Sequence, residues 1–389
     1  MSDTTQKPAD KKLRVLVLFN QVGEDWYEKL RQVDPKTLKF EPEYPIHVPT
    51  VAEECEDIAR ALRRAGYRAR AYNLQNDLRR LERVLRRSRP DVIFNLVEFF
   101  HDDAGMEAAV AGVFDLYQIP YTGSAPFTLE LCQRKGLTKR VLLDYGIATP
   151  RFKILEEPAV PAKFGLAYPV IVKPAWEDAS AGVDERSVVY NDEQLGAWLP
   201  HVFREFDQPM LIEEFIDGPE LHVSVWGNDP PLMLPPIEFD FSEMPEGHPP
   251  IVSYQAKWDP LSEVYHRVHT ICPARLSKRV MRKVEEVAIH TYEVAECRDY
   301  ARLDIRLKGN KPYVLEVNPN PDLTEGVSFM ESAERAGHSF SEALSRIVEM
   351  AAERKPQSTP APGTTPGQDW IPGPLPTAGT EPSEDAREE

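Results

Sequence analysis

The alternation of apolar and polar residues predicts a β-hairpin near residue 310. Residues 301–320 read ARLDIRLKGNKPYVLEVNPN, and apolar positions alternate on both sides of a Gly309-Asn310 turn. The opposite faces of the two strands are polar. We expect one apolar face on each strand, formed by Leu303, Ile305 and Leu307 and by Tyr313, Leu315 and Val317.

The polar face of this hairpin brings two carboxylates together. We take Asp304 and Glu316 as equally distant from the turn and expect them to be cross-strand neighbours. Arg302 and Asn318 form the next pair outward. Facing carboxylates weaken a sheet unless a cation lies between them. Two carboxylates and an amide oxygen suit Mg²⁺ or Mn²⁺, and the alternative is a solvated face with an Asp–Arg ion pair.

Other apolar runs predict further strands. Residues 13–19 and 90–96 read as strands, and residues 168–174 (YPVIVKP) as a buried strand that ends at a lysine. That lysine, Lys173, aims its ammonium either into a cleft or out to solvent. Residues 210–227 predict two strands joined by an Asp-Gly turn.

The sequence of strands and helices predicts an open α/β sheet and three subdomains. We place their boundaries at residues 1–123, 124–208 and 209–354. Thr50 and Glu53 are spaced as a capping box at the start of a helix. A further helix is expected near Ser277–Cys297, and residues 175–186 form a loop of small residues and acids.

The order of these segments resembles the D-alanine–D-alanine ligases of the ATP-grasp superfamily, from about Asp91 to Leu344. The resemblance implies an ATP-grasp fold. It also implies an enzyme that transfers the γ-phosphoryl group of ATP to a carboxylate, which an amine then attacks to form an amide. The matching stretches are FNLVE (94–98), IPYTGS (119–124), RKGLTKRVLLDYGIATP (134–150), YPVIVKP, IEEFIDGPEL (212–221), SYQAKW (253–258), ICPA (271–274), ARLDIRL and LEVNPNPDLT (315–324).

The resemblance also implies a role for each matching residue. Lys135 and Lys173 resemble the lysines that hold the phosphates of ATP. Lys257 resembles the lysine that reaches the transferred phosphate, and Ser180 lies in the loop that covers it. Arg302 resembles the arginine that stabilises the oxyanion. The hinge around the adenine is matched by Glu213, Glu214, Phe215 and Ile216, the ribose carboxylate by Glu220, and the magnesium ligands by Asp304, Glu316 and Asn318.

The chain departs from the family pattern where the family binds its amino acids. The opening Gly-Gly-x-Ser-x-Glu signature is missing. His47 falls near its glutamate, which binds the ammonium of the first D-alanine. A histidine, a tyrosine and a glycine of the family are replaced by Glu98, Trp258 and Asp322, and Ser328 lies beside the position of the serine that holds the acceptor carboxylate.

These departures predict a carboxylate–amine ligase whose substrates are not two D-alanines. Glu98, with Asp102 or Asp103, would supply the lost ammonium contact, unless those acids only cap the next helix. Phe99, Phe100 and Trp258 suggest a bulkier substrate. The alternatives are an authentic D-alanine–D-alanine ligase, an enzyme that activates a non-carboxylate oxygen in natural-product biosynthesis, and a non-catalytic nucleotide-binding protein. A homodimer is implied only by the resemblance.

Composition and charge limit the possible partners and cellular location of the protein. The chain has 389 residues and a net charge of −17 without a basic stripe, so we expect no nucleic-acid partner. It has no apolar run of membrane-spanning length and no apolar segment near its start that would act as a signal peptide. Four dispersed cysteines fit a reducing cytoplasm. Residues 355–389 are predicted to be disordered, with Trp370 and Ile371 as a short docking element.

Overall fold

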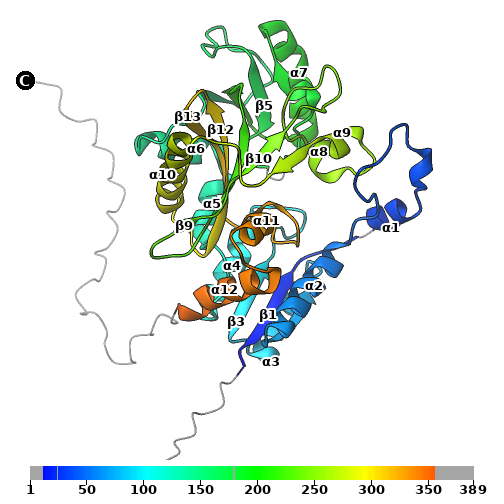
Figure 1. Ribbon diagram of the computed structural model, residues 1–389, viewed down its shortest axis with the longest axis vertical. Helices are drawn as coiled ribbons and strands as arrows, with labels where there is room; N and C mark the ends of the chain where they lie inside the picture. Colours follow the sequence, from blue (N-terminus) through cyan, green and yellow to red (C-terminus); the bar gives the residue numbers. More distant parts are fainter. Residues whose placement is uncertain (1–11, 24, 178–179, 355–389) are drawn as a thin grey trace, which may run out of the picture. The chain divides into compact units, whose positions relative to one another are not determined.

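Three β-sheets follow one another along the chain (Figure 1). This computed structural model describes residues 12–23, 25–177 and 180–354. The sheets belong to one compact unit that ends at Arg354. The predictions for the tail, including Trp370 and Ile371, fall outside the described residues.

The first sheet is parallel and has the order β2-β1-β3. Both of its faces are covered, since Val15 and Val17 of β1 pack into one core cluster and Leu16 and Leu18 into another. This explains why β1 is apolar at almost every position. The elements are β1 (Arg14–Phe19), α1 (Asp25–Arg31), α2 (Val51–Arg64), β2 (Arg68–Asn73), α3 (Leu78–Ser88), β3 (Val92–Leu96) and α4 (Met106–Leu116), with a 3₁₀ turn at Pro35–Thr37.

Helices from both ends of the described chain share one core. The predicted capping box of Thr50 and Glu53 is confirmed at the start of α2. Residues of α11 (Ser328–Arg335) and α12 (Phe340–Glu353) join α2 in one hydrophobic cluster. In Figure 1 the orange helix α12 lies near the blue elements β1 and α2. The C-terminal helices therefore complete the core beneath the N-terminal sheet.

The second sheet is antiparallel and has the order β4-β7-β5-β6. Helix α7 packs Leu195, Leu199 and Val202 against it. The elements of this region are α5 (Pro126–Gln133), α6 (Lys135–Asp144), β4 (Phe152–Leu155), β5 (Val170–Pro174), β6 (Val188–Val189), α7 (Asp192–Phe206) and β7 (Met210–Glu214), with a 3₁₀ turn at Glu185–Ser187.

The third sheet has the order β11-β10-β8-β12-β13, with β9 paired to β8. Val284 and Ala288 of α10 pack against Leu303 and Ile305 of β12 in one cluster. The elements are β8 (Glu220–Trp226), β9 (Leu232–Met233), β10 (Ile237–Asp240), α8 (Tyr254–Trp258), α9 (Glu263–Arg267), β11 (His269–Ile271), α10 (Lys278–Val294), β12 (Tyr300–Lys308) and β13 (Lys311–Asn318).

The Asp217-Gly218 turn joins the two predicted strands, β7 and β8, but these strands belong to different sheets. β7 pairs with β4 and β5 of the second sheet, whereas β8 pairs with β10 and β12 of the third. Residues 215–219 therefore form a hinge segment between two sheets. The proposed boundary at residue 208 separates β7 from the sheet to which it belongs.

The β12–β13 hairpin contains a bulge that the sequence pattern did not predict. Asp304 does pair with Glu316, and Arg302 with Asn318. This pairing does not result from equal spacing along the two strands. In a regular hairpin with a two-residue turn, Asp304 would pair with Leu315. The register shifts beside Asp304 and makes Leu315 the extra residue. Consequently Val314 joins Val317 in the core, while Leu315 lines a cavity and Tyr313 is only half-buried.

Two further sequence expectations concern cysteines and membranes. All four cysteines are free and buried, so no disulfide forms. Within residues 12–23, 25–177 and 180–354, no helix combines the length and apolar character that crossing a bilayer requires.

Candidate active site

A cleft between the second and third sheets collects the residues predicted to act on a nucleotide. Its empty space, including the part open to solvent, is about 870 Å³. Strands β5 and β7 supply one wall, and β8, β12 and β13 supply the other. The lining includes every residue predicted for the nucleotide, the metal or catalysis: Lys135, Lys173, Ser180, Glu213, Glu214, Phe215, Ile216, Glu220, Lys257, Arg302, Asp304, Glu316 and Asn318.

A buried carboxylate holds one of the cleft lysines in place. Glu213 is 1% exposed, and its two oxygens lie 2.5 Å from Lys173 Nζ and 2.7 Å from Lys139 Nζ. Burial acts to raise the pKa of Glu213, but the two ammonium groups outweigh it and hold that pKa at about 2. Burial also acts to lower the pKa of Lys173, but Glu213 and Glu316 raise it overall. Lys173 therefore stays charged at the wall of the cleft.

Lys139 is a structural partner of the site that the sequence reading missed. It is buried on α6, where its Nζ also donates to Thr149 Oγ1 at 2.7 Å. Burial lowers the pKa of Lys139. The missed signal was spacing, since Lys139 follows Lys135 by four residues and therefore lies on the same face of the helix.

The hinge segment is tied to the third sheet by a second unpredicted residue, Arg306. Its Nε and Nη2 donate to Glu220 Oε2 at 2.9 and 2.6 Å, and its Nη1 donates to the Ile216 carbonyl at 2.9 Å. The guanidinium also lies 4.6 Å from the centre of the Phe215 ring. Arg306 follows Asp304 by two residues on β12. Side chains two residues apart on a strand lie on the same face, so both of these side chains face the cleft.

Asp304, Glu316 and Asn318 lie together at the outer end of the hairpin. Asp304 accepts hydrogen bonds from Arg302 Nε at 2.8 Å and from Asn318 Nδ2 at 3.2 Å. Glu316 Oε1 lies 2.8 Å from Lys135 Nζ. The Asp–Arg ion pair thus exists, but Arg302 is only 5% exposed, so this is not a solvated face.

The charge state of this group suits a hard cation. Burial opposes ionisation of Asp304, but the charge of Arg302 and its hydrogen bonds hold the pKa of Asp304 well below its usual range. Two carboxylates with an amide oxygen match the oxygen ligands that Mg²⁺ takes in proteins. The residues present therefore fit the predicted metal.

His222 was also not predicted, and it links the hairpin to Ser328. Its Nδ1 lies 2.8 Å from Ser328 Oγ, and its Nε2 lies 3.5 Å from Asp304 Oδ1. Burial, and then the Arg302 charge, lower the pKa of His222 to about 3. The imidazole is therefore neutral, and Ser328 is engaged by it.

A second cavity, with about 840 Å³ of empty space including the part open to solvent, adjoins the first. The two share Lys135, Lys257, Arg302, Glu316 and Asn318 in their linings. Three of the predicted substrate residues line the second cavity, namely Glu98, Trp258 and Asp322.

Other predicted substrate residues lie elsewhere. His47 is exposed with Nε2 3.3 Å from the Val33 carbonyl, and neither it nor Ser328 lines these two cavities. Phe100 is buried in the core of the first sheet, so its expected contact with substrate is wrong. Asp103 Oδ1 accepts from the Gly105 N–H at 2.8 Å, but α4 has no side-chain cap at its start, so Asp103 does not cap this helix.

The covering residues Ser180 and Lys257 meet the cleft from outside the two sheets. Ser180 has a left-handed backbone (φ +63°), and its Oγ donates to the Val252 carbonyl at 3.1 Å. Such a conformation in a residue other than glycine is costly and often marks a functional loop. Burial, and then Arg302, lower the pKa of Lys257, whose Nζ lies 5.0 Å from the Trp258 ring centre.

Comparisons with known proteins identify the family to which the chain is similar. A family model described as the D-ala D-ala ligase C-terminus matches residues 141–349. An uncharacterized protein of Sinorhizobium fredii, y4sG, is 32% identical over 68% of this chain and 75% of its own length. A D-alanine–D-alanine ligase of Desulforudis audaxviator is 31% identical over 76% of this chain and 92% of its own length.

A solved structure has the same fold. The crystal structure of a D-alanine–D-alanine ligase from Bacillus anthracis, complexed with ATP, superimposes with a TM-score of 0.66 at 22% identity. The match covers 88% of this chain and 98% of that one. The predicted α/β, ATP-grasp class is confirmed, and this chain belongs to the D-alanine–D-alanine ligase family.

Proposed function

We propose that this chain is an ATP-dependent ligase that joins a carboxylate to an amine through an acylphosphate, and that its substrates are not two D-alanines. The observation that carries the proposal is the common wall of the two cavities, where Lys257, Arg302 and Glu316 face both. A phosphoryl donor in the first cavity and an acceptor carboxylate in the second would meet at that wall.

The first cavity offers the contacts that bound ATP needs. The backbone of Glu214–Ile216 would hold the adenine, and Glu220 would accept hydrogen bonds from the ribose. Lys135 and Lys173 would pair with the phosphates, and Ser180 would help to close over them. Asp304, Glu316 and Asn318 would hold Mg²⁺ or Mn²⁺, which would neutralise phosphate charge.

The proposed reaction has two steps. A substrate carboxylate oxygen attacks the γ-phosphorus, the bond from that phosphorus to the bridging oxygen breaks, and ADP leaves. The amine nitrogen then attacks the acyl carbon, the bond from carbon to the phosphate oxygen breaks, and the nitrogen loses a proton. Arg302 would stabilise the oxyanion that exists after the amine attacks and before the bond to the phosphate oxygen breaks. Donors of this kind contribute about 3–4 kcal/mol. Lys257 would contact the transferred phosphoryl group, and closure would exclude water from the acylphosphate.

The negative charge of the second cavity supports a substrate with an ammonium group. Glu98 and Asp322 line this cavity, and Glu54 lies beside them on α2. Burial, and then the charges of Asp322 and Glu98, raise the pKa of Glu54 to about 8. A cation bound near Glu98 would offset this crowding, and Trp258, which is 40% exposed, offers an apolar wall to a larger side chain.

An authentic D-alanine–D-alanine ligase is the second candidate. It is favoured by the names of relatives that are 31 and 32% identical to this chain. In that case the rebuilt pocket would bind the same amino acids through different residues, and D-alanine would be the best substrate of any tested panel.

The role of Glu98 can be tested directly. Glu98→Gln should raise KM for the amine-bearing substrate about tenfold, because a hydrogen bond to a charged group contributes about 1.5–3 kcal/mol. The matched control is Glu130→Gln, which alters another carboxylate of the same cavity that already pairs with Arg134 at 3.4 Å. Steady-state kinetics with the best substrate pair would measure both, and an unchanged KM in Glu98→Gln would remove Glu98 from the proposed site.

A further inference from the structure

A second group of potential metal ligands lies outside the cleft, where two loops meet. The lid segment, residues 241–268, leaves the third sheet after β10 and returns at β11, and it carries Lys257 and Trp258. Its two ends are adjacent, because Asp240 pairs with His269. The N-terminal loop, residues 32–49, replaces the missing family signature and contacts this segment.

The contact between the two loops is anchored by a buried histidine. His266 of the lid segment is fully buried, and its Nδ1 accepts hydrogen bonds from the backbone N–H groups of Glu43 at 3.1 Å and Tyr44 at 3.0 Å. Its Nε2 therefore carries the proton and donates to the Pro260 carbonyl at 2.9 Å. The backbone of Glu43 is thus fixed to the lid segment, although its side chain is exposed.

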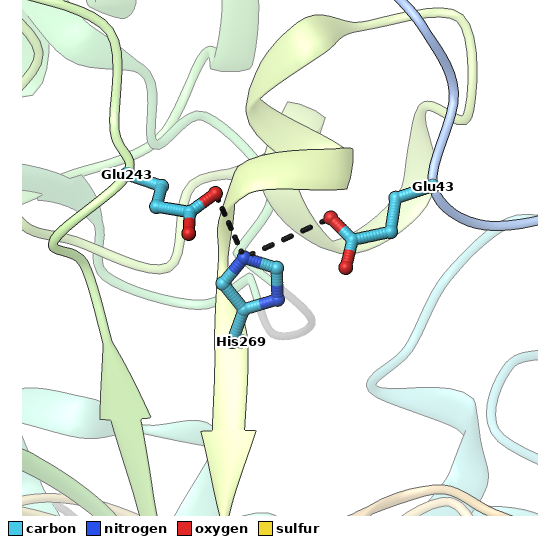
Figure 2. A group of neighbouring side chains, drawn as sticks. All are labelled: Glu43, Glu243 and His269. Atoms are coloured by element: carbon cyan, nitrogen blue, oxygen red, sulfur yellow. Dashed lines mark ion pairs between the residues drawn. The ribbon is translucent and has the colours of Figure 1, made fainter.

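Figure 2 shows three side chains that converge on one another, Glu43, Glu243 and His269. Glu43 comes from the N-terminal loop, Glu243 follows β10, and His269 begins β11. One ligand atom from each lies within 4.8 Å of the other two. The ends of the lid segment and the N-terminal loop therefore each contribute one potential metal ligand.

The distances within this group fit a shared ion better than a direct hydrogen bond. His269 Nε2 lies 3.5 Å from Glu243 Oε2 and 3.8 Å from Glu43 Oε2. An N–H···O hydrogen bond spans about 2.7–3.2 Å. A tetrahedral ion with bonds of about 2.1 Å separates its ligands by roughly 3.4 Å. The three atoms have to move little to bind such an ion.

The other nitrogen of the same imidazole already has the partner that a metal ligand requires. Tyr44 Oη lies 3.1 Å from His269 Nδ1. A proton on Nδ1 can be donated to this oxygen, which leaves the Nε2 lone pair facing the two carboxylates. Arg267 Nη1 lies 4.0 Å from Glu43 Oε2, so this guanidinium competes with a bound ion for one of the two carboxylates.

We propose that Glu43, Glu243 and His269 bind a transition-metal dication of the Zn²⁺ class, with water in the fourth position. An imidazole with two carboxylates suits zinc, whereas Mg²⁺ prefers oxygen ligands alone. The ion ties the N-terminal loop to both ends of the lid segment, and it is separate from the magnesium position proposed in the cleft. The metal-free form of the same group is a histidine between two carboxylates.

Zinc titration of the full chain tests this site without ATP or substrates, so its result does not depend on the proposed ligase activity. The protein is stripped with a chelator and titrated with Zn²⁺ by calorimetry in excess Mg²⁺, which occupies oxygen-only sites. We expect one zinc per chain. Its affinity should fall more than tenfold in His269→Gln, Glu43→Gln and Glu243→Gln, and about tenfold in Tyr44→Phe.

Two controls separate this site from others. His201→Gln removes a histidine that pairs with a single carboxylate among the described residues, Glu205 at 3.4 Å, and should leave the affinity unchanged. Asp304→Asn should also retain the site, because it alters the cleft. Glu43 and Glu243 are exposed, so their variants remain informative even where His269→Gln fails to fold. Equal zinc affinity in the wild type and in both glutamate variants would overturn the proposal.

Discussion

At the scale of single residues, the cleft keeps a fully buried carboxylate ionised in order to hold a lysine. Glu213 lies between Lys139, whose side chain is 2% exposed, and Lys173, whose side chain is 14% exposed. The Lys139 side chain is therefore part of the interior, whereas the Lys173 side chain reaches the cleft. A buried ion group of this kind adds little net stability, but removing one member leaves an uncompensated charge.

Lys139→Met should therefore destabilise the fold. We expect the free energy of unfolding to fall by about 3 kcal/mol, at the low end for a broken buried pair because Lys173 remains. The matched control is Arg151→Met. It breaks an exposed ion pair with Glu214, which follows Glu213 on β7 (3.1 Å), and it should lower the free energy of unfolding by less than about 1 kcal/mol. Urea denaturation at neutral pH measures both, and equal losses would contradict the role given to Lys139.

Glu54 predicts a dependence of stability on pH. Burial, and then Asp322, Glu98, Asp57 and Glu53, raise its pKa from 4.5 to about 8. Between these values the folded chain holds a proton that the unfolded chain has released, so stability falls as the pH rises through this window and then levels off. Glu54→Gln should remove that fall and gain more stability, relative to the wild type, at pH 8 than at pH 5.

The control for this prediction lies on the same helix. Glu56→Gln alters an exposed carboxylate whose partner is Arg63 at 2.7 Å, and it should show the same pH dependence as the wild type. Urea denaturation at several pH values between 5 and 8 measures all three proteins. Parallel curves for Glu54→Gln and the wild type would show that Glu54 is not protonated in the folded state.

At the scale of elements, the hinge segment decides how the two walls of the cleft meet. β7 ends at Glu214 in one sheet and β8 begins at Glu220 in the next. Gly218 passes so close to β12 that a Cβ on it would collide with the backbone carbonyl oxygen of Leu307. Backbone of a central strand cannot move aside as a flexible side chain can.

Gly218→Ala should therefore displace the hinge. We expect a loss of about 1–3 kcal/mol of stability, as for other overpacked positions, and a higher KM for ATP because the hinge backbone faces the position proposed for the adenine. Gly112→Ala is the control, since a Cβ there meets nothing within 4 Å inside helix α4. That change should stabilise by about 0.5–1 kcal/mol, and effects of the same sign in both variants would contradict this account of Gly218.

The same elements show what local sequence encodes. Apolar runs predicted β1, β3 and β5, and the spacing of Thr50 and Glu53 predicted the start of α2, because these signals depend on neighbouring residues only. The bulge at Leu315 was missed because Val314 and Leu315 are both apolar, so either residue could be assigned to the core face of the strand. An Asp-Gly pair favours a turn but does not specify whether the next strand joins the same sheet.

At the scale of the whole molecule, the fold brings the predicted nucleotide residues from separate stretches of the chain into one cleft. Each stretch carried its own motif, so its position could be predicted without knowing the fold. The substrate residues were harder, because His47 was aligned through a region without a motif and the structure puts it outside both cavities. Lys139 and Arg306 share a face with predicted residues by helix and strand spacing, but their buried contacts, like those of His222, appear only in the assembled sheets.

Incubation of the pure protein with ATP, Mg²⁺ and a panel of amino acids that includes D-alanine tests the central claim most directly. Phosphate release and product mass are measured together. The account predicts ADP, phosphate and a product equal in mass to both substrates minus water, with a pair other than two D-alanines reacting fastest. Two results would contradict the account. One is a product in which the substrate carboxylate has not become an amide, and the other is ATP binding without phosphate release for any pair.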